Sequence, residues 1–325
     1  MRAVTRLLTA CLAVLLGVAH ALAAEPPQIK VGTLKFGTVN WELKVISGGI
    51  DNKHGFTLAQ VDFADKDATS IALQSGDVDV IVTDWIWVAM QRRLGHNFTF
   101  VPFSRSVGAV MADPAKGIHS VADLAGRSLG VAGGATDKSW VLLQAYARKV
   151  ANLELKDKAD VQFGAPPLLN ELVQRGKLDA VLNFWNFNAR LKPKGYVAVI
   201  SIRDILPALG LDADPPLLGW VFSERWATDH PELAKGLIDA SYEAKALMKS
   251  DEAVWDRLRP IMDADDDAVF RALKEGYREG IPGRYERKDI AAAESAFAVM
   301  RKADPASVAN LEALPHGTFW AGYLQ

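Results

Sequence analysis

Residues 74–85 read QSGDVDVIVTDW, and the pattern returns one hundred residues later, where residues 174–185 read QRGKLDAVLNFW. Gln, Gly, the second Asp and Trp recur in register, with apolar residues matched between them. Each copy predicts a helix that ends at a glycine, a short buried strand, and a polar turn that opens a new helix. The repeat therefore indicates that the chain carries two related α/β units.

A second pair of segments supports the duplication at nearly the same offset. Residues 29–41 predict a strand, a glycine-containing loop and a helix start, and residues 128–140 have the same arrangement 99 residues later. Runs rich in valine and isoleucine alternate with helical patterns from Ile29 to about Ile200, which is typical of mainly parallel sheet. The alternative is chance similarity between ordinary βα units, because Gly-x-x-Asp turns are common.

The pattern changes after Pro231, where apolar residues fall at helical spacings to the end of the chain. Two apolar, strand-like stretches flanked by prolines, residues 107–112 and 217–222, predict a two-strand hinge between the units. We therefore expect an α/β fold of two lobes with duplicated parallel-type sheets and a helical C-terminal extension. The expected boundaries are 1–23 for a signal peptide, 24–108 for the first part of lobe 1, 109–217 for lobe 2, and 218–325 for the return to lobe 1 and the C-terminal helices.

The first 23 residues have the features of a secretory signal. Arg2 and Arg6 precede an almost continuous apolar run, and Ala21-Leu22-Ala23 offers a cleavage site near Ala23. We expect a cleaved signal and a periplasmic protein. An uncut membrane anchor is the alternative, but the apolar run is short for a bilayer, which favours cleavage.

Composition excludes several classes of function. The chain has a net charge of −2, and loss of the two signal arginines makes it more acidic, so nucleic acid is not expected as a partner. The only cysteine, Cys11, lies in the signal. A mature chain without a thiol can form neither disulfides nor thiolate metal sites, and it cannot use cysteine catalysis.

Tryptophans mark the loops where a ligand would bind. In open parallel α/β sheets, ligands bind beyond the carboxyl ends of the strands. Four such loops each carry a tryptophan near the expected helix start, and Trp220 lies on the second crossover between lobes. Aromatic faces there suit an apolar, aromatic or cationic ligand. Packing within each lobe is the alternative role. The aromatic candidates for ligand binding are Trp41, Trp85, Trp87, Trp140, Trp185 and Trp220.

Polar residues share these loops, and helix capping is the alternative role for at least half of them. Asp84 could hold an ammonium group, whereas Lys35 or Lys138 together with helix N–H groups could hold a carboxylate or sulfonate. The mixed signs favour a small amphipathic or zwitterionic solute over a bare inorganic anion. The remaining ligand-binding candidates are Thr38, Asn40, Gly134, Thr136, Asp137, Asn183 and Asn186.

Several short motifs stand out along the chain: Val31-Gly32, residues 76–79 with Thr83-Asp84, the 133–137 loop, residues 176–180 with Asn183, and Pro216-Leu217-Leu218-Gly219. Together with the signal peptide, they resemble the nitrate/sulfonate/taurine group of periplasmic binding proteins, which also includes binders of thiamine pyrimidine precursors. The resemblance covers about residues 28–250 and implies a type II periplasmic binding fold, a small-molecule ligand, and partnership with the permease and ATPase of an ABC importer. Trp85 and Trp87 stand where the group more usually has small residues or prolines.

No reactive constellation for an enzyme can be assembled from the sequence. The histidines lack an i, i+4 metal pair, and the acidic run at residues 263–267 lacks the turn glycine and the glutamate of a calcium loop. Pyrimidine-precursor synthases share the fold class but use cysteine and pyridoxal phosphate. We therefore expect no catalysis, no cofactor, no metal, and a monomeric binding protein. A sensory protein that presents its ligand to a receptor is the alternative, because both classes use lobe closure as the signal.

Overall fold

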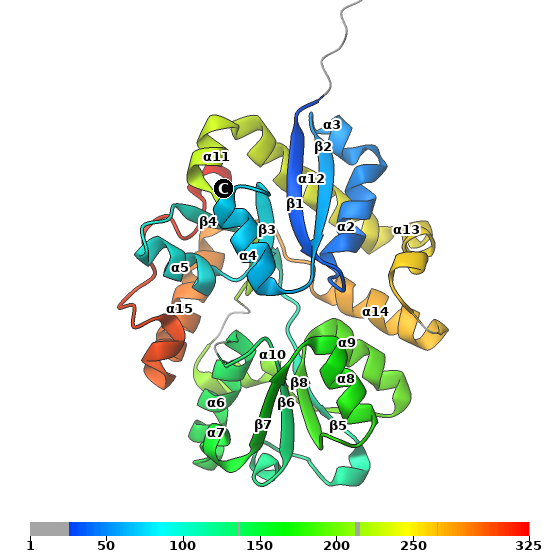
Figure 1. The fold of residues 1–325 in the computed structure, drawn as a ribbon, viewed down its shortest axis with the longest axis vertical. Helices are drawn as coiled ribbons and strands as arrows, with labels where there is room; N and C mark the ends of the chain where they lie inside the picture. The colour runs from blue at the N-terminus through cyan, green and yellow to red at the C-terminus, as the bar shows by residue number, and fades with distance from the viewer. Residues whose placement is uncertain (1–25, 136, 212–214, 265, 325) are drawn as a thin grey trace, which may run out of the picture.

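The computed structural model describes residues 26–135, 137–211, 215–264 and 266–324. The predicted signal peptide and Thr136 lie outside the described residues. The chain forms two stacked α/β lobes, each built on a five-stranded sheet (Figure 1). The strands are β1 (Gln28–Leu34), β2 (Thr57–Phe63), β3 (Val80–Thr83), β4 (Phe98–Ser104), β5 (Ala109–Ala112), β6 (Ser128–Ala132), β7 (Asp160–Gly164), β8 (Ala180–Asn183), β9 (Val197–Ser201) and β10 (Leu218–Ser223).

The α-helices flank the sheets, and the last five follow the second crossover. They are α2 (Val39–Val45), α3 (Asp51–Lys53), α4 (Lys66–Ser75), α5 (Trp85–Arg93), α6 (Lys138–Ala151), α7 (Leu155–Lys158), α8 (Pro166–Gln174), α9 (Trp185–Leu191), α10 (Ile202–Ile205), α11 (Glu224–Asp229), α12 (Pro231–Ser250), α13 (Glu252–Leu258), α14 (Asp267–Glu279) and α15 (Arg287–Ala303). Short 3-10 or π turns occupy η1 (Ile46–Ile50), η2 (Pro114–Lys116), η3 (Ala122–Leu124), η4 (Lys192–Lys194), η5 (Pro207–Leu209), η6 (Arg259–Ile261), η7 (Pro305–Val308) and η8 (Ala321–Tyr323).

The two sheets have the same topology, which confirms the two-lobed fold predicted from the repeat. Their strand orders are β2-β1-β3-β10-β4 and β7-β6-β8-β5-β9. β3 and β8, the strands of the two repeat copies, each occupy the centre of a different sheet. The repeated glycines Gly76 and Gly176 both have positive φ, as expected where a helix must reverse before its strand.

Each sheet is mixed rather than wholly parallel, which refines the sequence prediction. β1, β2 and β3 are parallel, as are β6, β7 and β8. In each sheet, one antiparallel strand from a crossover of the chain is inserted beside the central strand: β10 pairs with β3, and β5 pairs with β8. Alternating βα units predict the three parallel strands, but local sequence does not show which neighbours a crossover strand will take.

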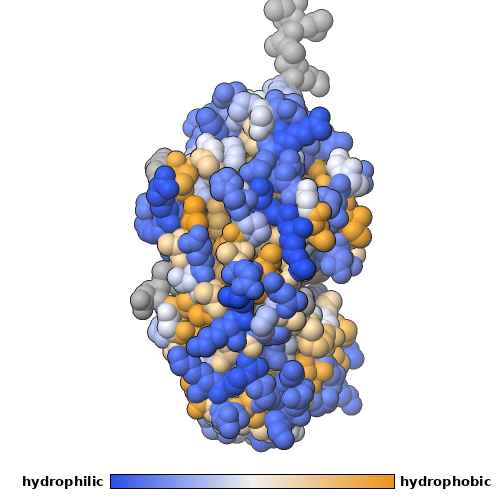
Figure 2. All heavy atoms as spheres, turned by 90° about the vertical axis from the view of Figure 1, so that its left-hand side faces the viewer, coloured by the Kyte–Doolittle hydropathy of each residue, from blue (hydrophilic) through white to orange (hydrophobic). Residues whose placement is uncertain are grey.

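The chain passes between the sheets twice, from Ser104 to Ala109 and from Ser201 to Leu218. The C-terminal helices also contact both lobes. α14 packs along α9 of the second lobe, and α15 packs against α6 (Figure 1). Seen from the side of α5 and α15, hydrophilic side chains cover much of both lobes, with smaller hydrophobic areas between them (Figure 2). The inter-lobe seam is therefore bounded by helices that follow the second crossover.

Candidate functional site

Two of the predicted tryptophans meet where the lobes face each other. Trp41 lies in the first turn of α2 in the first lobe, and Trp185 begins α9 in the second. Their rings are 6.1 Å apart, nearly perpendicular, and both contact Tyr277 of α14 at 6.0 and 6.3 Å. Edge-to-face aromatic pairs at these separations are attractive. This aromatic contact joins the two lobes through residues from equivalent loops of the repeat.

The other predicted tryptophans lie against the interior of the protein. Trp85, Trp140 and Trp220 are 0%, 2% and 1% exposed. Trp85 and Trp140 pack in one apolar cluster with residues of α15, and Trp220 donates its indole N–H to Ser241 at 3.1 Å. Trp87 is partly buried, and its ring packs at a tilt against Phe98, with centroids 5.3 Å apart. Burial on this scale favours packing roles for these four side chains, because α15 and α12 cover loops that an isolated βα unit would leave open.

Four charged side chains from helix N-termini in both lobes form what we term the four-charge cluster: Lys66, Asp84, Asp137 and Lys138. Asp84 caps α5 by accepting from the Trp87 N–H at 2.8 Å, and Lys66 donates to its other oxygen at 2.6 Å. In the second lobe, Asp137 caps α6 by accepting from the Ser139 N–H at 2.8 Å. Each of the two lysines therefore lies beside a carboxylate that also caps the N-terminus of a helix.

The charges of the cluster act on one another across the lobes. Burial alone would raise the pKa of Asp84, but its ion pair with Lys66 and the charge of Lys138 outweigh burial and hold that pKa at about 2. Lys138 is only 9% exposed, and its nearest paired carboxylate oxygen, on Asp137, is 3.8 Å away. That distance is too long for a hydrogen bond. Lys138 is therefore a nearly buried ammonium with a distant ionic partner.

The remaining predicted residues are placed as follows. Asn183 is buried and donates to Pro166 O at 3.0 Å and to Asn170 Oδ1 at 2.9 Å, so its amide supports α8. Asn40 donates to Leu34 O at 3.0 Å, while its own buried Oδ1 has no hydrogen-bond partner among the residues that the structure describes. Asn186 is 5% exposed near the start of α9. Gly134, with φ of 89°, has open space where a side chain would stand.

A small inner cavity lies beside the aromatic contact. Thr38, Phe103 and Trp185 line it together with Lys245 and Tyr277, and its volume of about 10 Å³ is close to that needed for one water molecule. Of these five residues, Thr38 and Trp185 were predicted from the sequence. The cavity therefore draws on two loops of the repeat and on α12 and α14.

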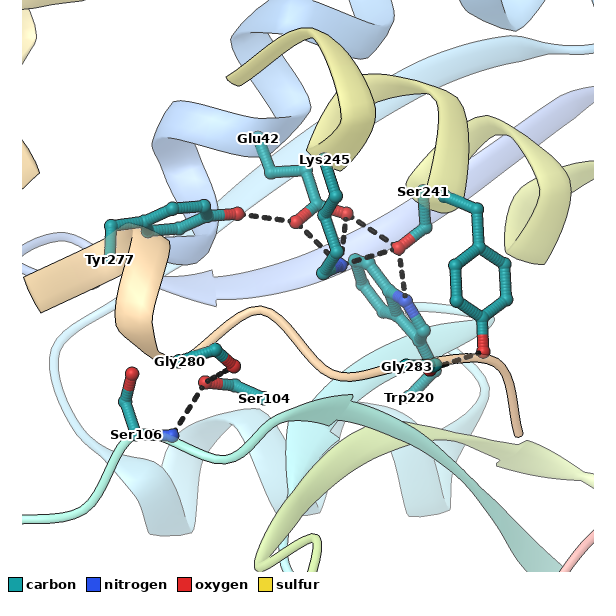
Figure 3. A network of polar contacts seen from close by, with 10 residues as sticks. Glu42, Ser104, Ser106, Trp220, Ser241, Lys245, Tyr277, Gly280 and Gly283 are labelled. Carbon is teal, nitrogen blue, oxygen red and sulfur yellow. Dashed lines mark hydrogen bonds and ion pairs between the residues drawn. The ribbon is translucent and has the colours of Figure 1, made fainter. Parts of the chain in front are cut away.

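Behind this cavity lies a buried polar network centred on Glu42 (Figure 3). Its carboxylate accepts from Ser241 at 2.6 Å, from Lys245 at 2.7 Å and from Tyr277 at 2.6 Å. Burial lowers the pKa of Lys245, although Glu42 acts in the opposite direction. Burial and the nearby carboxylate raise the pKa of Tyr277. The network could not be predicted from the sequence, because its members come from α2, α12 and α14 and share no motif.

An outer groove of about 550 Å³ opens beside the same seam. Phe36 from the loop before α2 contacts Phe187 of α9, with ring centroids 6.0 Å apart. Arg175 and Lys194 contribute cations to the lining of the groove. We use the name outer groove for the space that these four residues border. Arg175 lies within the second repeat copy, but no feature of that motif predicts a cavity beside it.

Comparisons with known proteins show the family to which this chain belongs. The NMT1/THI5-like family model matches residues 52–252. The chain belongs to the NMT1/THI5-like family. This finding agrees with the resemblance drawn from the short sequence motifs. No curated protein matches the chain by sequence.

Solved structures show how widely the fold of this NMT1/THI5-like protein is shared. The alkanesulfonate-binding protein SsuA from Xanthomonas axonopodis pv. citri, bound to MOPS, has a TM-score of 0.71 and 17% identity, over 92% of this chain and 99% of that one. The periplasmic aliphatic sulphonate-binding protein SsuA from Escherichia coli has a TM-score of 0.69 and 16% identity, over the same shares. The desulfurization enzyme DSZB has a TM-score of 0.59 and 15% identity, over 91% and 96%.

These likenesses establish the fold of the NMT1/THI5-like chain and include both binding proteins and an enzyme. Across the described ranges, no three His, Cys, Asp or Glu side chains gather in a group that could hold a metal ion. Within the same ranges, no helix is both long and apolar enough to cross a membrane.

Proposed function

We propose that this protein is the periplasmic solute-binding component of an ABC importer, and that it captures a small amphipathic or zwitterionic organic solute between its lobes without changing it chemically. The observation that carries the proposal is the four-charge cluster, which brings two cations and two carboxylates from both lobes to the ends of three helices. The two structures of sulfonate-binding proteins with the same fold support the same class of function.

The charges of the cluster match a solute that carries both signs. Lys138, at the N-terminus of α6, has its nearest paired carboxylate at 3.8 Å, so an anionic group could approach it more closely than Asp137 does. Asp84 is ionised at neutral pH and could accept from an ammonium group of the same solute. A solute held by both groups would bridge the lobes, because Asp84 and Lys138 belong to different lobes.

The proposed architecture of the working protein follows from these positions. We propose a cleaved signal ending near Ala23, lobe 1 over residues 24–108 and 218–325, lobe 2 over residues 109–217, and a hinge at the two crossovers. The mature protein would act as a monomer and deliver its solute to a membrane permease and its ATPase. Of the residues named from the sequence, Thr38, Asp84, Asp137, Lys138 and Trp185 remain the strongest candidates for ligand contact, and Lys66 joins them.

A binding screen with a matched variant tests this function. Aliphatic sulfonates, amino-acid-like zwitterions and aromatic heterocycles are compared by thermal shift, since a ligand at one hundred times its Kd stabilises by about 2.7 kcal/mol. The affinity of the best compound is then measured calorimetrically for wild type, Lys138→Met, and Lys149→Met at the exposed end of the same helix. We expect Lys138→Met alone to weaken binding about tenfold or more, the equivalent of one charge-assisted hydrogen bond.

Two results would contradict the proposal. One is the absence of stabilisation by any of the three compound classes. The other is recovery, by NMR, of a chemically altered compound at a catalytic rate, which would make the protein an enzyme on this fold. Equal affinity in wild type and Lys138→Met would show that the solute does not bind at the four-charge cluster. The protein would still be a binding protein, with its site elsewhere.

A further inference from the structure

The outer groove has the size of a small-molecule site. Its volume of about 550 Å³ falls within the roughly 300–1,000 Å³ that small-molecule pockets occupy, whereas the inner cavity holds no more than about one water. It is bordered by α8, α9 and η4 of the second lobe and by Phe36 of the first. The groove is thus accessible in the lobe arrangement of this structure, in which the aromatic contact closes the inner seam.

The floor of the groove is held by a chain of side-chain amides. Asn183 donates to Asn170 Oδ1, and Asn170 donates to the carbonyl of Phe187 at 2.9 Å. Gln174 donates to the carbonyl of Asn170 at 2.8 Å, and its own amide oxygen accepts from Lys194 at 2.7 Å. Hydrogen-bonded side chains lose less conformational freedom when a ligand binds, so this floor is organised in advance. The network gives Asn183 of the repeat a role in shaping the groove.

The charge of the groove favours an anion. Three cations line it, Arg175, Arg190 and Lys194, against two carboxylates, Glu171 and Asp263. Arg175 pairs with Glu171 one helical turn away, and Arg190 donates to two backbone carbonyls. Lys194 donates to the amide oxygen of Gln174, a neutral group that carries no charge to offset that of the ammonium.

The aromatic wall adds a preference for a flat, apolar body. Phe36 and Phe187 meet edge to face across the lobes, with an angle of 67° between their planes. A flat ring system could pack on the partly exposed Phe36 while its acidic group faces Arg175 and Lys194. The groove and the inner cavity share no lining residue, although Phe36 and Phe187 each lie two residues from a residue that lines the cavity, Thr38 and Trp185.

We infer that the outer groove is a separate binding site for flat organic anions, such as aromatic sulfonates or carboxylates, and that it is occupied without opening of the lobes. Occupancy there would concentrate such compounds at the entrance of the inter-lobe seam. The inference does not require the four-charge cluster to bind the same molecule, so the two proposals fail separately.

Calorimetric titration with naphthalene-1-sulfonate tests this site. Wild type is compared with Arg175→Glu/Lys194→Glu, in which two exposed side chains of the groove reverse charge, and with Lys149→Glu/Lys156→Glu, an exposed pair on α6 and α7 that gives the same net charge. Lys138→Met serves as the variant of the four-charge cluster. We expect the groove variant alone to weaken binding about tenfold, and the affinity of wild type to fall as salt is raised. Urea unfolding checks that all variants fold.

Each other outcome overturns the inference. Equal affinity in the groove and control variants would show that the groove cations do not recognise the anion. If only Lys138→Met lost affinity for naphthalene-1-sulfonate, the probe would bind in the four-charge cluster. If Lys138→Met and the groove variant both lost affinity, the two places would form one shared site. A second substitution, Phe36→Ala, removes the aromatic wall and should weaken naphthalene-1-sulfonate more than ethanesulfonate, whereas equal effects on both would refute the aromatic preference.

Discussion

At the residue scale, capping explains several of the polar positions that the repeat brought to attention. Asp84 and Asp137 both cap helices, and both also belong to the four-charge cluster. Sequence reasoning treated these roles as alternatives, but a carboxylate has enough lone pairs for a backbone N–H and a cation together. Lys66 was missed because a lysine at the first position of a helix carries no motif. Its partner, Asp84, lies 18 residues further along the sequence, and the contact between the two forms only in the folded chain.

The tryptophans show the limit of residue-level reasoning. The repeat placed Trp41, Trp85, Trp140 and Trp185 at equivalent loops, and the structure brings Trp41 and Trp185 together. Trp85 and Trp140 are buried against α15, which lies about 150 residues or more further along the chain. No local pattern near these two tryptophans indicates that a distant helix will cover them.

We predict that Asp84 makes stability depend on pH in the acid range. Its pKa falls from an ordinary 3.8 to about 2 in the folded protein, so its contribution is complete above about pH 4 and is lost as the pH falls toward 2. Asp84→Asn should therefore lower the free energy of unfolding at pH 6 and reduce its change between pH 4 and pH 2. Urea unfolding at several pH values measures both effects. If the free energy of unfolding changed as much between pH 4 and pH 2 in Asp84→Asn as in wild type, the ion pair of Asp84 with Lys66 would not contribute to stability.

The buried pair Glu42 and Lys245 gives a second prediction. Lys245→Met leaves the fully buried carboxylate with two hydroxyl donors and no cation, which should cost about 3–5 kcal/mol of stability. Adding Glu42→Gln removes the uncompensated charge and should recover part of the loss. Chemical denaturation of the two single variants and the double variant forms the test cycle. Additive losses would show that the two side chains are not coupled.

At the element scale, the repeat predicted the short strands and the helices that follow them. β3 and β8 end at Thr83 and Asn183, one hundred residues apart, as the two motif copies require. The antiparallel insertions of β5 and β10 escaped prediction, since both strands are short apolar runs whose partners are set by the path of the chain. Periodicity after Pro231 correctly predicted helices, but it did not show that α14 and α15 contact the second lobe.

α14 supplies a prediction about the contact between lobes. A Cβ atom at Gly276 would lie 2.9 Å from two ring carbons of Trp185, so alanine there must push α14 and α9 apart. Gly276→Ala should weaken solute binding by about 1–3 kcal/mol through overpacking. Stability should fall less, because alanine favours the helix by about 1 kcal/mol.

The matched control for this prediction is Gly283→Ala, where nothing lies within 4 Å of the added atom. Calorimetry compares the affinities of both variants with that of wild type for the best compound from the screen. Equal affinity in all three proteins would mean that the α14–α9 contact is not part of the bound state.

At the scale of the whole molecule, the two sheets share one topology and are joined by two segments of the chain, residues 105–108 and 202–217. The lobes could therefore rotate as rigid bodies, but α14 and α15 each rest on both lobes and must slide or separate when they do. α15 is tied to α6 by Arg148, which donates to the carbonyl of Ala303 at 2.8 Å. The polar network of Glu42 fixes α14 to α2 and α12. Opening is thus expected to break contacts of α9 with α14 before those within the first lobe.

We predict that solute binding shifts the protein from open to closed lobe arrangements. Groups from both lobes would contact the solute, so the closed state has the higher affinity and its population rises on binding. The radius of gyration from solution X-ray scattering should fall when the best compound from the screen saturates wild type. Tryptophan fluorescence should change at the same time, because Trp41 and Trp185 meet only when the lobes are together. Lys138→Met at the same compound concentration should show neither change, and identical profiles for free and saturated wild type would refute closure.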